Sequence, residues 1–267
     1  MCVNGACAAR PPKPCSGLME SVNIVKNEGS RAGSGPDARS DFGPDFRHVK
    51  SWIFDLDNTL YCADSGIFAQ IEARMTDYVM AFLKLPREEA YARQKALYRQ
   101  YGTTLNGLMR EHDASPEDYL HYVHDIDLAS LQPDSELTQA IEKLPGRRFV
   151  FTNGCRDHAG RILERLGMTA LFDEVWDIRT MGFLPKPQME AYQSVVTASA
   201  VTCGEAAMFD DLPGNLVPAS RLGMTTIWLK TGAPYGKHGP QTDIAAGDID
   251  HETDNLAQFL QSIRILP

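Results

Sequence analysis

Two aspartates, Asp55 and Asp57, stand two residues apart directly after the apolar residues 52–54. A strand that ends between them gives the two carboxylates different positions, so that one attacks a substrate while the other moves a proton. Phosphoryl transfer needs such a nucleophile, neutralisation of charge and a proton donor for the leaving oxygen. In this arrangement Thr59 is expected to bond the backbone of the turn and hold Asp57. The alternative is an ordinary Asp-Asn turn, and the pair alone leaves both interpretations open.

Two later segments place polar groups after predicted strands. Thr152, Asn153 and Gly154 follow the apolar run 149–151 and offer a hydroxyl and successive N–H groups to a phosphate oxygen. Lys186, between two prolines, supplies a cation that offsets the repulsion between Asp55 and a phosphate. The alternatives are a polar turn and an exposed loop lysine.

A second acidic pair, Asp210 and Asp211, follows the apolar run 206–209. Two acids at the end of a buried strand are costly unless they bind a cation. Together with Asp55 they offer the hard oxygen ligands that Mg²⁺ prefers, and Asn215 is placed to orient Lys186 or one acid. The alternative is a helix N-terminus with acids that its dipole favours. Because all four signals occur at predicted strand ends, we favour a catalytic site with Asp55 as nucleophile and Asp57 as general acid and base.

Apolar periodicity predicts the elements that position these residues. Strands are expected at 148–151, 174–178, 206–209 and 225–229. Helices are expected at 135–144, 158–166, 188–198 and 255–263, and a further helix follows Asp211 and ends at residue 222. This alternation predicts an α/β fold with a doubly wound parallel sheet, in which ligands lie beyond the carboxyl ends of the strands.

The segment that follows the first strand reads as helical up to about residue 127, with Gly102 ending one of its helices. It is too long for an ordinary connection. We therefore predict an inserted α-helical cap at 64–131, on a core formed by 46–63 and 132–267. Residues 1–45 are rich in Gly, Pro, Ser and Arg, which predicts a disordered extension.

The composition limits the class of protein. Hydrophobic residues make up 43% of the 267 residues, which is enough for a packed core, and the net charge of −9 argues against a nucleic-acid polymer or an anionic membrane as partner. No apolar run approaches the roughly 20 residues that cross a bilayer. The six cysteines match neither a zinc pattern nor a disulfide framework. We expect a cytoplasmic protein that acts on a small phosphorylated metabolite, and its oligomeric state stays open.

The chain from about Trp52 to Leu229 resembles the haloacid dehalogenase (HAD) superfamily. The resemblance is carried by four motifs, Asp55-Leu56-Asp57-Asn58-Thr59, Thr152-Asn153, Lys186-Pro187 and Asp210-Asp211. It implies a Rossmann-like core, a C1-type helical cap and Mg²⁺-dependent phosphohydrolase activity, with Thr152 and Lys186 binding phosphate. The implied metal ligands are Asp55, the Asp57 backbone carbonyl and Asp211, with Asp210 binding directly or through water.

Within that superfamily the chain is similar to the pyrimidine 5′-nucleotidase branch, chiefly through Tyr61 and the pair His158-Ala159. This similarity implies UMP or CMP as substrate. His158 opens a helix after the phosphate turn, where a substrate contact and a capping role are both open. The alternatives are a sugar-phosphate phosphatase or mutase and a catalytically silent scaffold on the same fold. A dehalogenase would need neither Asp57 nor a metal.

Other candidate residues have plain interpretations. His121 and His124 lie three residues apart without a further ligand, so a surface or packing role is favoured over a metal site. Cys155 is interpreted as a small filler residue. The stripe Tyr91, Tyr98 and Tyr101 is interpreted as core packing rather than a platform for a nucleobase.

Overall fold

The computed structural model describes residues 43–232, 239–240 and 242–265. The extension predicted for residues 1–45 therefore lies outside the described residues up to residue 42. Its last residues are anchored, because the Arg264 backbone N–H donates to the Pro44 carbonyl oxygen at 2.8 Å. The Arg264 guanidinium also donates to the Asp45 carboxylate at 2.7 Å. The ordered core thus begins shortly before residue 46.

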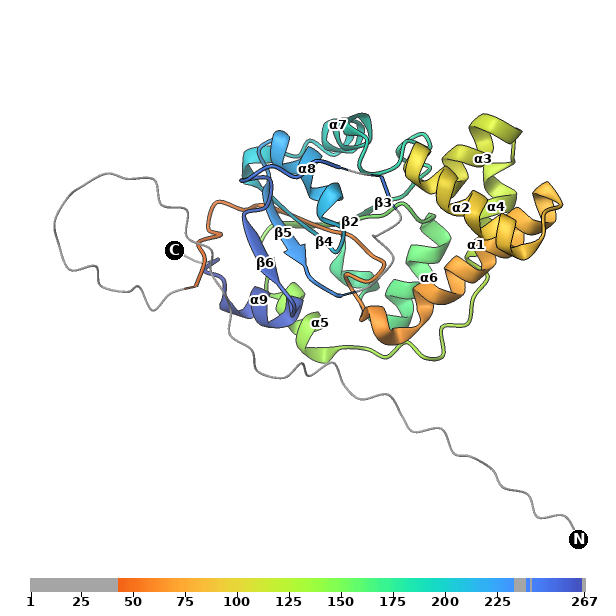
Figure 1. Ribbon diagram of the computed structural model, residues 1–267. Helices are drawn as coiled ribbons and strands as arrows, with labels where there is room; N and C mark the ends of the chain where they lie inside the picture. The colour runs from red at the N-terminus through yellow and green to blue at the C-terminus, as the bar shows by residue number, and fades with distance from the viewer. Residues whose placement is uncertain (1–42, 233–238, 241, 266–267) are drawn as a thin grey trace, which may run out of the picture. The chain divides into compact units, whose positions relative to one another are not determined.

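The described strands form one parallel sheet in the order β3-β2-β1-β4-β5-β6 (Figure 1). Their bounds are β1 Ser51–Phe54, β2 Arg147–Phe151, β3 Glu174–Trp176, β4 Ala206–Asp210, β5 Thr225–Leu229 and β6 His251–Thr253. From β1 the chain adds β2 and β3 on one side and then β4 to β6 on the other. The direction of winding therefore reverses between β1 and β4, which is where doubly wound sheets bind ligands. The predicted fold class is confirmed.

Helices cover both faces of the sheet. Trp52 and Phe54 pack into one core with α5, α6 and α9, while Ile53 packs into a second core with α7 and α8. Successive side chains of a strand point to opposite faces, so the fully apolar run of β1 serves both cores. These helices span α5 Ser135–Glu142, α6 Arg156–Leu166, α7 Met189–Ala198, α8 Pro213–Arg221 and α9 Leu256–Ser262.

Four helices lie between β1 and β2 in the chain and are grouped together in Figure 1. They are α1 Ile67–Leu83, α2 Arg87–Tyr101, α3 Thr104–His112 and α4 Pro116–Val123. Gly102 ends α2 with φ +84°, a conformation that glycine adopts without a Cβ clash. Thr103 and Ser115 cap α3 and α4 by accepting backbone N–H groups. The helical insertion is present, and the bounds 64–131 of a cap stay a prediction.

Two details differ from the expected elements. Strand β6 was not predicted, because three residues of mixed polarity carry no recognisable period. Strand β1 ends at Phe54, so Asp55 follows the strand rather than closing it.

Among the described residues, no helix has both the length and the apolar character that crossing a membrane requires.

Candidate active site

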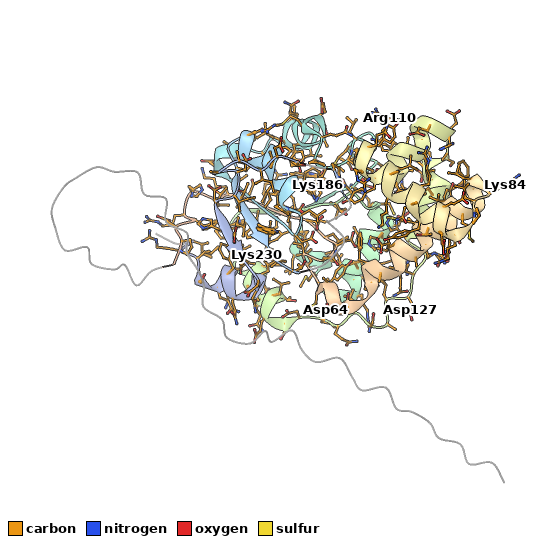
Figure 2. All side chains as sticks on the ribbon, viewed as in Figure 1. Asp64, Lys84, Arg110, Asp127, Lys186 and Lys230 are labelled. Atoms are coloured by element: carbon orange, nitrogen blue, oxygen red, sulfur yellow. The ribbon has the colours of Figure 1, made fainter. Side chains whose placement is uncertain are left out.

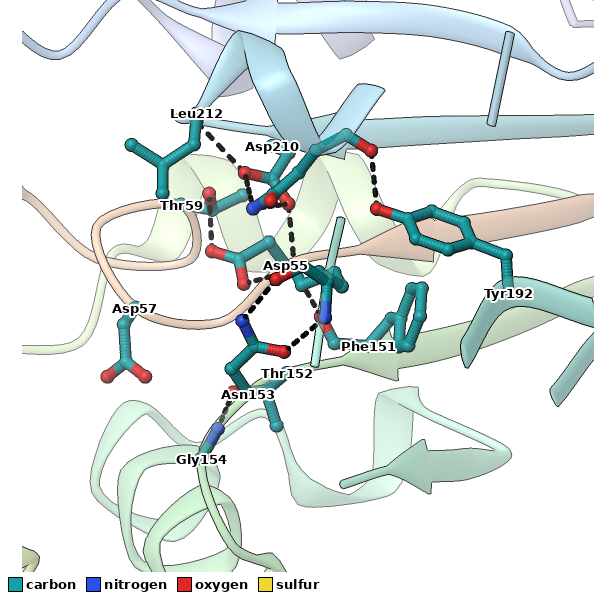
Figure 3. A network of polar contacts seen from close by, with 12 residues as sticks. Asp55, Asp57, Thr59, Phe151, Thr152, Asn153, Gly154, Tyr192, Asp210 and Leu212 are labelled. Carbon is teal, nitrogen blue, oxygen red and sulfur yellow. Dashed lines mark hydrogen bonds and ion pairs between the residues drawn. The ribbon is translucent and has the colours of Figure 1, made fainter. Parts of the chain in front are cut away.

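Asp55 lies at the switch point of the sheet. Its backbone N–H donates to the Phe209 carbonyl oxygen at 2.9 Å, which ties the residue to the end of β4. Its Oδ1 accepts from Lys186 Nζ at 2.8 Å and its Oδ2 accepts from Thr59 Oγ1 at 3.0 Å (Figure 3). The expectation that Thr59 holds Asp57 is wrong. One turn of chain places the Thr59 hydroxyl over Asp55 instead.

Lys186, whose place in the molecule is labelled in Figure 2, is the cation that joins the carboxylates of Asp55 and Asp210. Its side chain is 1% exposed, and Nζ donates to Asp55 Oδ1, to Asp210 Oδ2 at 2.7 Å and to the Phe151 carbonyl oxygen at 2.8 Å. These contacts use all three ammonium protons. Burial alone would lower the pKa of Lys186, but the carboxylates of Asp210 and Asp55 raise it above its usual value. Lys186 is therefore fixed in the charged form.

Asp210 closes β4 and is fully buried. Its carboxylate accepts from Asn215 Nδ2 at 2.9 and 3.1 Å and from the Leu212 backbone N–H at 2.9 Å. The expectation that Asn215 orients an acid is thus confirmed by its contacts. Tyr192 adds support from α7, because its hydroxyl donates to the Asn215 carbonyl oxygen.

Asp55, Asp210 and Asp211 converge, with one carboxylate oxygen from each lying within 4.8 Å of the others. Burial raises the pKa of Asp55 to about 7, although Lys186 opposes the shift. Burial and the neighbouring carboxylates raise the pKa of Asp211 well above its usual value. Three carboxylates face one ammonium, which leaves a double negative excess when all are ionised. Oxygen donors with this excess fit a divalent cation such as Mg²⁺.

The turn after β2 lies beside this cluster. Thr152 Oγ1 accepts from the Gly154 backbone N–H at 2.9 Å. The Asn153 amide is occupied by the lysine loop, because it accepts from the Lys186 N–H at 2.8 Å and donates to the Lys186 carbonyl at 3.1 Å. A Cβ on Gly154 would lie 3.2 Å from both Thr152 Oγ1 and His158 Cδ2, so the close packing here favours glycine.

Asp57 faces a different set of partners. Its Oδ1 accepts from the Tyr61 hydroxyl at 2.6 Å and lies 2.8 Å from His158 Nε2. A carboxylate only accepts, so the shared proton is carried by the imidazole nitrogen. Burial would raise the pKa of Asp57, but His158 and Tyr61 lower it below its usual value. His158 was expected to contact the substrate. In the structure its side chain contacts the carboxylate of Asp57.

A second imidazole supports the first from the end of α4. The rings of His124 and His158 stack with centroids 4.3 Å apart and planes at 12°. His124 Nδ1 lies 3.2 Å from Cys155 Sγ. Burial, and then repulsion by His158, lowers the pKa of His124 to about 3, so this ring is neutral. Burial raises the pKa of Cys155, in line with its interpretation as a filler residue.

These side chains line the floor of a pocket beneath α1–α4. The floor includes Asp55, Asp57 and Lys186, and the walls carry the following residues of the four helices: Phe68, Ile71, Glu72, Met75, Gln94, Lys95, Tyr98, Thr104, Leu105, Tyr119, Leu120 and Val123. The interpretation of the tyrosine stripe as core is wrong, because Tyr91 is 42% exposed and Tyr98 lies on the pocket wall. The spacing of aromatic residues along a helix does not show whether they pack in the core or line a pocket, because both environments are apolar.

Some members of the site were predicted and others were not. Asp55 and Asp210, at the ends of β1 and β4, come together as expected with Lys186, which lies in the loop between β3 and α7. Asp211 joins them at the carboxylate cluster. The packing role expected for His124 agrees with its burial, but its partner His158 was not predicted, because the spacing of His121 and His124 does not show which side chain they pack against.

Comparison with known proteins identifies a family and a curated relative. The sequence profile of a family described as haloacid dehalogenase-like hydrolase matches residues 49–223. Phosphate metabolism protein 8 of Saccharomyces cerevisiae is 25% identical over 193 residues, which cover 66% of this chain and 60% of that protein. This chain therefore spans less than two thirds of the length of that relative.

Solved structures resemble the fold. A haloacid dehalogenase of Xanthobacter autotrophicus, specific for L-2-haloacids by its name, matches with a TM-score of 0.51 and 16% identity, over 80% of this chain and 97% of the other. A HAD phosphatase from Thermococcus onnurineus matches with a TM-score of 0.54 and 18% identity, over the same shares of the two chains. At these identities the likeness concerns the fold alone.

Proposed function

The chain belongs to the haloacid dehalogenase-like hydrolases, and we propose that it is an Mg²⁺-dependent phosphomonoesterase that works through a phosphoryl group on Asp55. The observation that carries the proposal is the convergence of the Asp55, Asp210 and Asp211 carboxylates, the first two of which are bound by Lys186. A phosphate dianion next to these carboxylates would meet strong repulsion unless Lys186 and a bound cation offset their charge. The name of the yeast relative, which refers to phosphate metabolism, agrees with a phosphoester substrate.

The reaction follows from the positions of the two aspartates. An oxygen of Asp55 attacks phosphorus and forms an O–P bond, while the bond from phosphorus to the leaving oxygen breaks. Asp57 reacts in its protonated form, which the lowered pKa makes a readier proton donor, and gives that proton to the leaving oxygen. Water then attacks phosphorus, the bond from phosphorus to the Asp55 oxygen breaks, and the water passes a proton back to Asp57. The products are an alcohol and inorganic phosphate, and both carboxyl groups return to their starting state.

The neighbouring residues have distinct parts in this proposal. Lys186 holds Asp55 and binds a phosphate oxygen by exchanging one of its three present contacts for it. Thr152 and the N–H groups of Asn153 and Gly154 bind the other oxygens, and the Gly154 N–H gives up its bond to Thr152 Oγ1 to do so. The ligands proposed for the metal are oxygens of Asp55, Asp210 and Asp211 and the backbone carbonyl of Asp57. Bound Mg²⁺ supplies positive charge beside the phosphoryl oxygens.

The proposed substrate is a pyrimidine nucleoside 5′-monophosphate, UMP or CMP, selected by residues 64–131 acting as a cap. Gln94 is a polar group for such recognition in the pocket wall. Its Oε1 accepts from Thr76 Oγ1 at 2.8 Å, whereas its amide nitrogen contacts the Met75 sulfur, a weak acceptor, at 3.5 Å. The Gln94 N–H groups are thus suited to the carbonyl oxygen of a base. We expect Gln94→Leu to raise KM for UMP more than KM for p-nitrophenyl phosphate.

The test is phosphate release from nucleotides, sugar phosphates and pyridoxal phosphate, with Mg²⁺ and with EDTA. We expect UMP and CMP to give the highest kcat/KM and EDTA to abolish turnover. Asp55→Asn should abolish phosphate release, whereas Asp64→Asn, an exposed acid of the same kind, should leave it unchanged. Preference for a sugar phosphate would refute the substrate but keep the chemistry. Unchanged activity of Asp55→Asn would refute the phosphorylated aspartate.

A further inference from the structure

The carboxylate of Asp57 is held in an asymmetric way. Both of its hydrogen bonds, from the Tyr61 hydroxyl and from His158 Nε2, reach the same oxygen, Oδ1. Within the described part of the chain, Oδ2 receives no hydrogen bond. Oδ2 lies towards the phosphate turn, 3.7 Å from where a Cβ of Gly154 would be. One oxygen is therefore an anchor and the other is free to react.

The two anchors are themselves rigid. His158 is 1% exposed, it stands in the first turn of α6, and its ring is stacked on His124. Tyr61 is buried and its pKa is raised well above the usual value by burial and then by Asp57, so its hydroxyl keeps the proton that it donates. Asp57 is thus oriented by one group from the loop after β1 and one from the core helix α6.

We propose that Tyr61 and His158 are positioning residues that hold Oδ1 of Asp57, so that Oδ2 exchanges the proton with the leaving oxygen. This inference rests on the proposed function, in which Asp57 is the general acid. In the first step the O–H bond at Oδ2 breaks and the leaving oxygen gains the proton. In the second step water loses a proton to Oδ2. Tyr61 and His158 take no part in the proton transfer and only hold Oδ1 by their hydrogen bonds.

If Tyr61 and His158 position the general acid, the loss of kcat/KM in their variants should depend on the basicity of the leaving group. Phenyl phosphate and p-nitrophenyl phosphate differ by one nitro group, and p-nitrophenolate is the weaker base, so its departure needs little help from an acid. The value of kcat/KM covers the steps up to leaving-group departure and excludes the later hydrolysis. A variant with a misplaced acid therefore loses kcat/KM on phenyl phosphate and keeps it on p-nitrophenyl phosphate.

The experiment measures both values with Mg²⁺ for Tyr61→Phe, His158→Leu and His158→Gln, with Asp57→Asn as reference. We expect Tyr61→Phe and His158→Leu each to lower the phenyl to p-nitrophenyl ratio of kcat/KM by about 10-fold, since each removes one hydrogen bond to a charged group. His158→Gln keeps an N–H donor and should restore most of the ratio. Tyr122→Phe and His121→Leu, on the exposed part of α4, are the matched controls.

The outcomes separate the two proposals. If Asp57→Asn lowers the ratio and both Tyr61→Phe and His158→Leu leave it unchanged, the positioning role is overturned and the proposed function stands. If Asp57→Asn reduces both substrates equally, Asp57 is not the general acid and both proposals fail on this point. Retained turnover of p-nitrophenyl phosphate shows in the same assay that a variant is folded.

Discussion

Replacement of Lys186 by methionine removes the positive charge at the centre of the site while keeping a side chain of similar length. Its ammonium lies 2.8 Å from Asp55 Oδ1 and 2.7 Å from Asp210 Oδ2. Asp210 is 0% exposed and Asp55 is 6% exposed, so water cannot replace the lost charge. We therefore expect Lys186→Met to be destabilised as well as inactive.

The size of the effect follows from the burial of the pair. Removing one partner of a buried ion pair costs about 3–5 kcal/mol, because the other charge is left uncompensated. For a domain of this size, each kcal/mol lowers Tm by about 2–4 °C, so a fall of roughly 10 °C is expected. The cost should shrink as the pH falls. Without Lys186 the folded carboxyls have raised pKa values, and protonation then relieves their repulsion.

The assay is urea unfolding in EDTA of the wild type, Lys186→Met and the double variant Lys186→Met/Asp210→Asn. The double variant should regain part of the lost stability, because one of the uncompensated charges is gone. Lys143→Met, at an exposed helix end, is the control. Mg²⁺ should stabilise Lys186→Met more than the wild type, since the cation replaces the missing charge. Equal stability of Lys186→Met and the wild type in EDTA would refute the reasoning.

Three further predictions concern neighbouring positions. Asn215→Ala removes two hydrogen bonds to buried Asp210 and should cost about 1–3 kcal/mol in urea unfolding; an unchanged midpoint would contradict this. His124 has a folded pKa of about 3 against a usual 6.5, so the unfolded chain alone takes up its proton as the pH falls below 6.5. About 2 kcal/mol of stability should therefore be lost between pH 7 and pH 5, a slope that His124→Gln removes; equal slopes for both proteins would disprove it. Gly154→Ala crowds two side chains at 3.2 Å and should lower kcat/KM for phosphate esters by about tenfold. Gly160→Ala, where nothing lies within 4 Å, should leave kcat/KM unaltered, and equal effects of the two would count against the argument.

The core strands were predictable because their buried residues form short continuous apolar runs in the sequence. The buried stretches of β1, β2 and β4 are mostly apolar on both faces, as is typical of parallel strands covered by helices. Strand β6 was missed because it pairs with β5 at the edge of the sheet, where three residues need no pattern of their own. The four helices after β1 were predictable from their period and capping residues.

The site also has contacts that the sequence predicts and contacts that it does not. Parallel strands bring their carboxyl ends to one edge, so chemistry-bearing residues at those ends were expected to meet, and Asp55, Asp210 and Lys186 do. Partners across the fold were not predictable. Thr59 contacts Asp55 rather than holding Asp57, because the direction of one hydroxyl depends on the exact path of the turn.

The amino-acid sequence by itself determined that Asp55 and Asp210 at strand ends and Lys186 in a loop beyond another strand belong to one site, because alternating strands and helices form a parallel sheet whose carboxyl ends share one edge. Only the tertiary structure decided how Asp57 is held. Its partner His158 lies 101 positions away, and His124 reaches that ring from another helix. Such contacts depend on how α4 and α6 pack against each other. Packing between helices that are distant in the chain cannot be inferred from the local sequence of either helix.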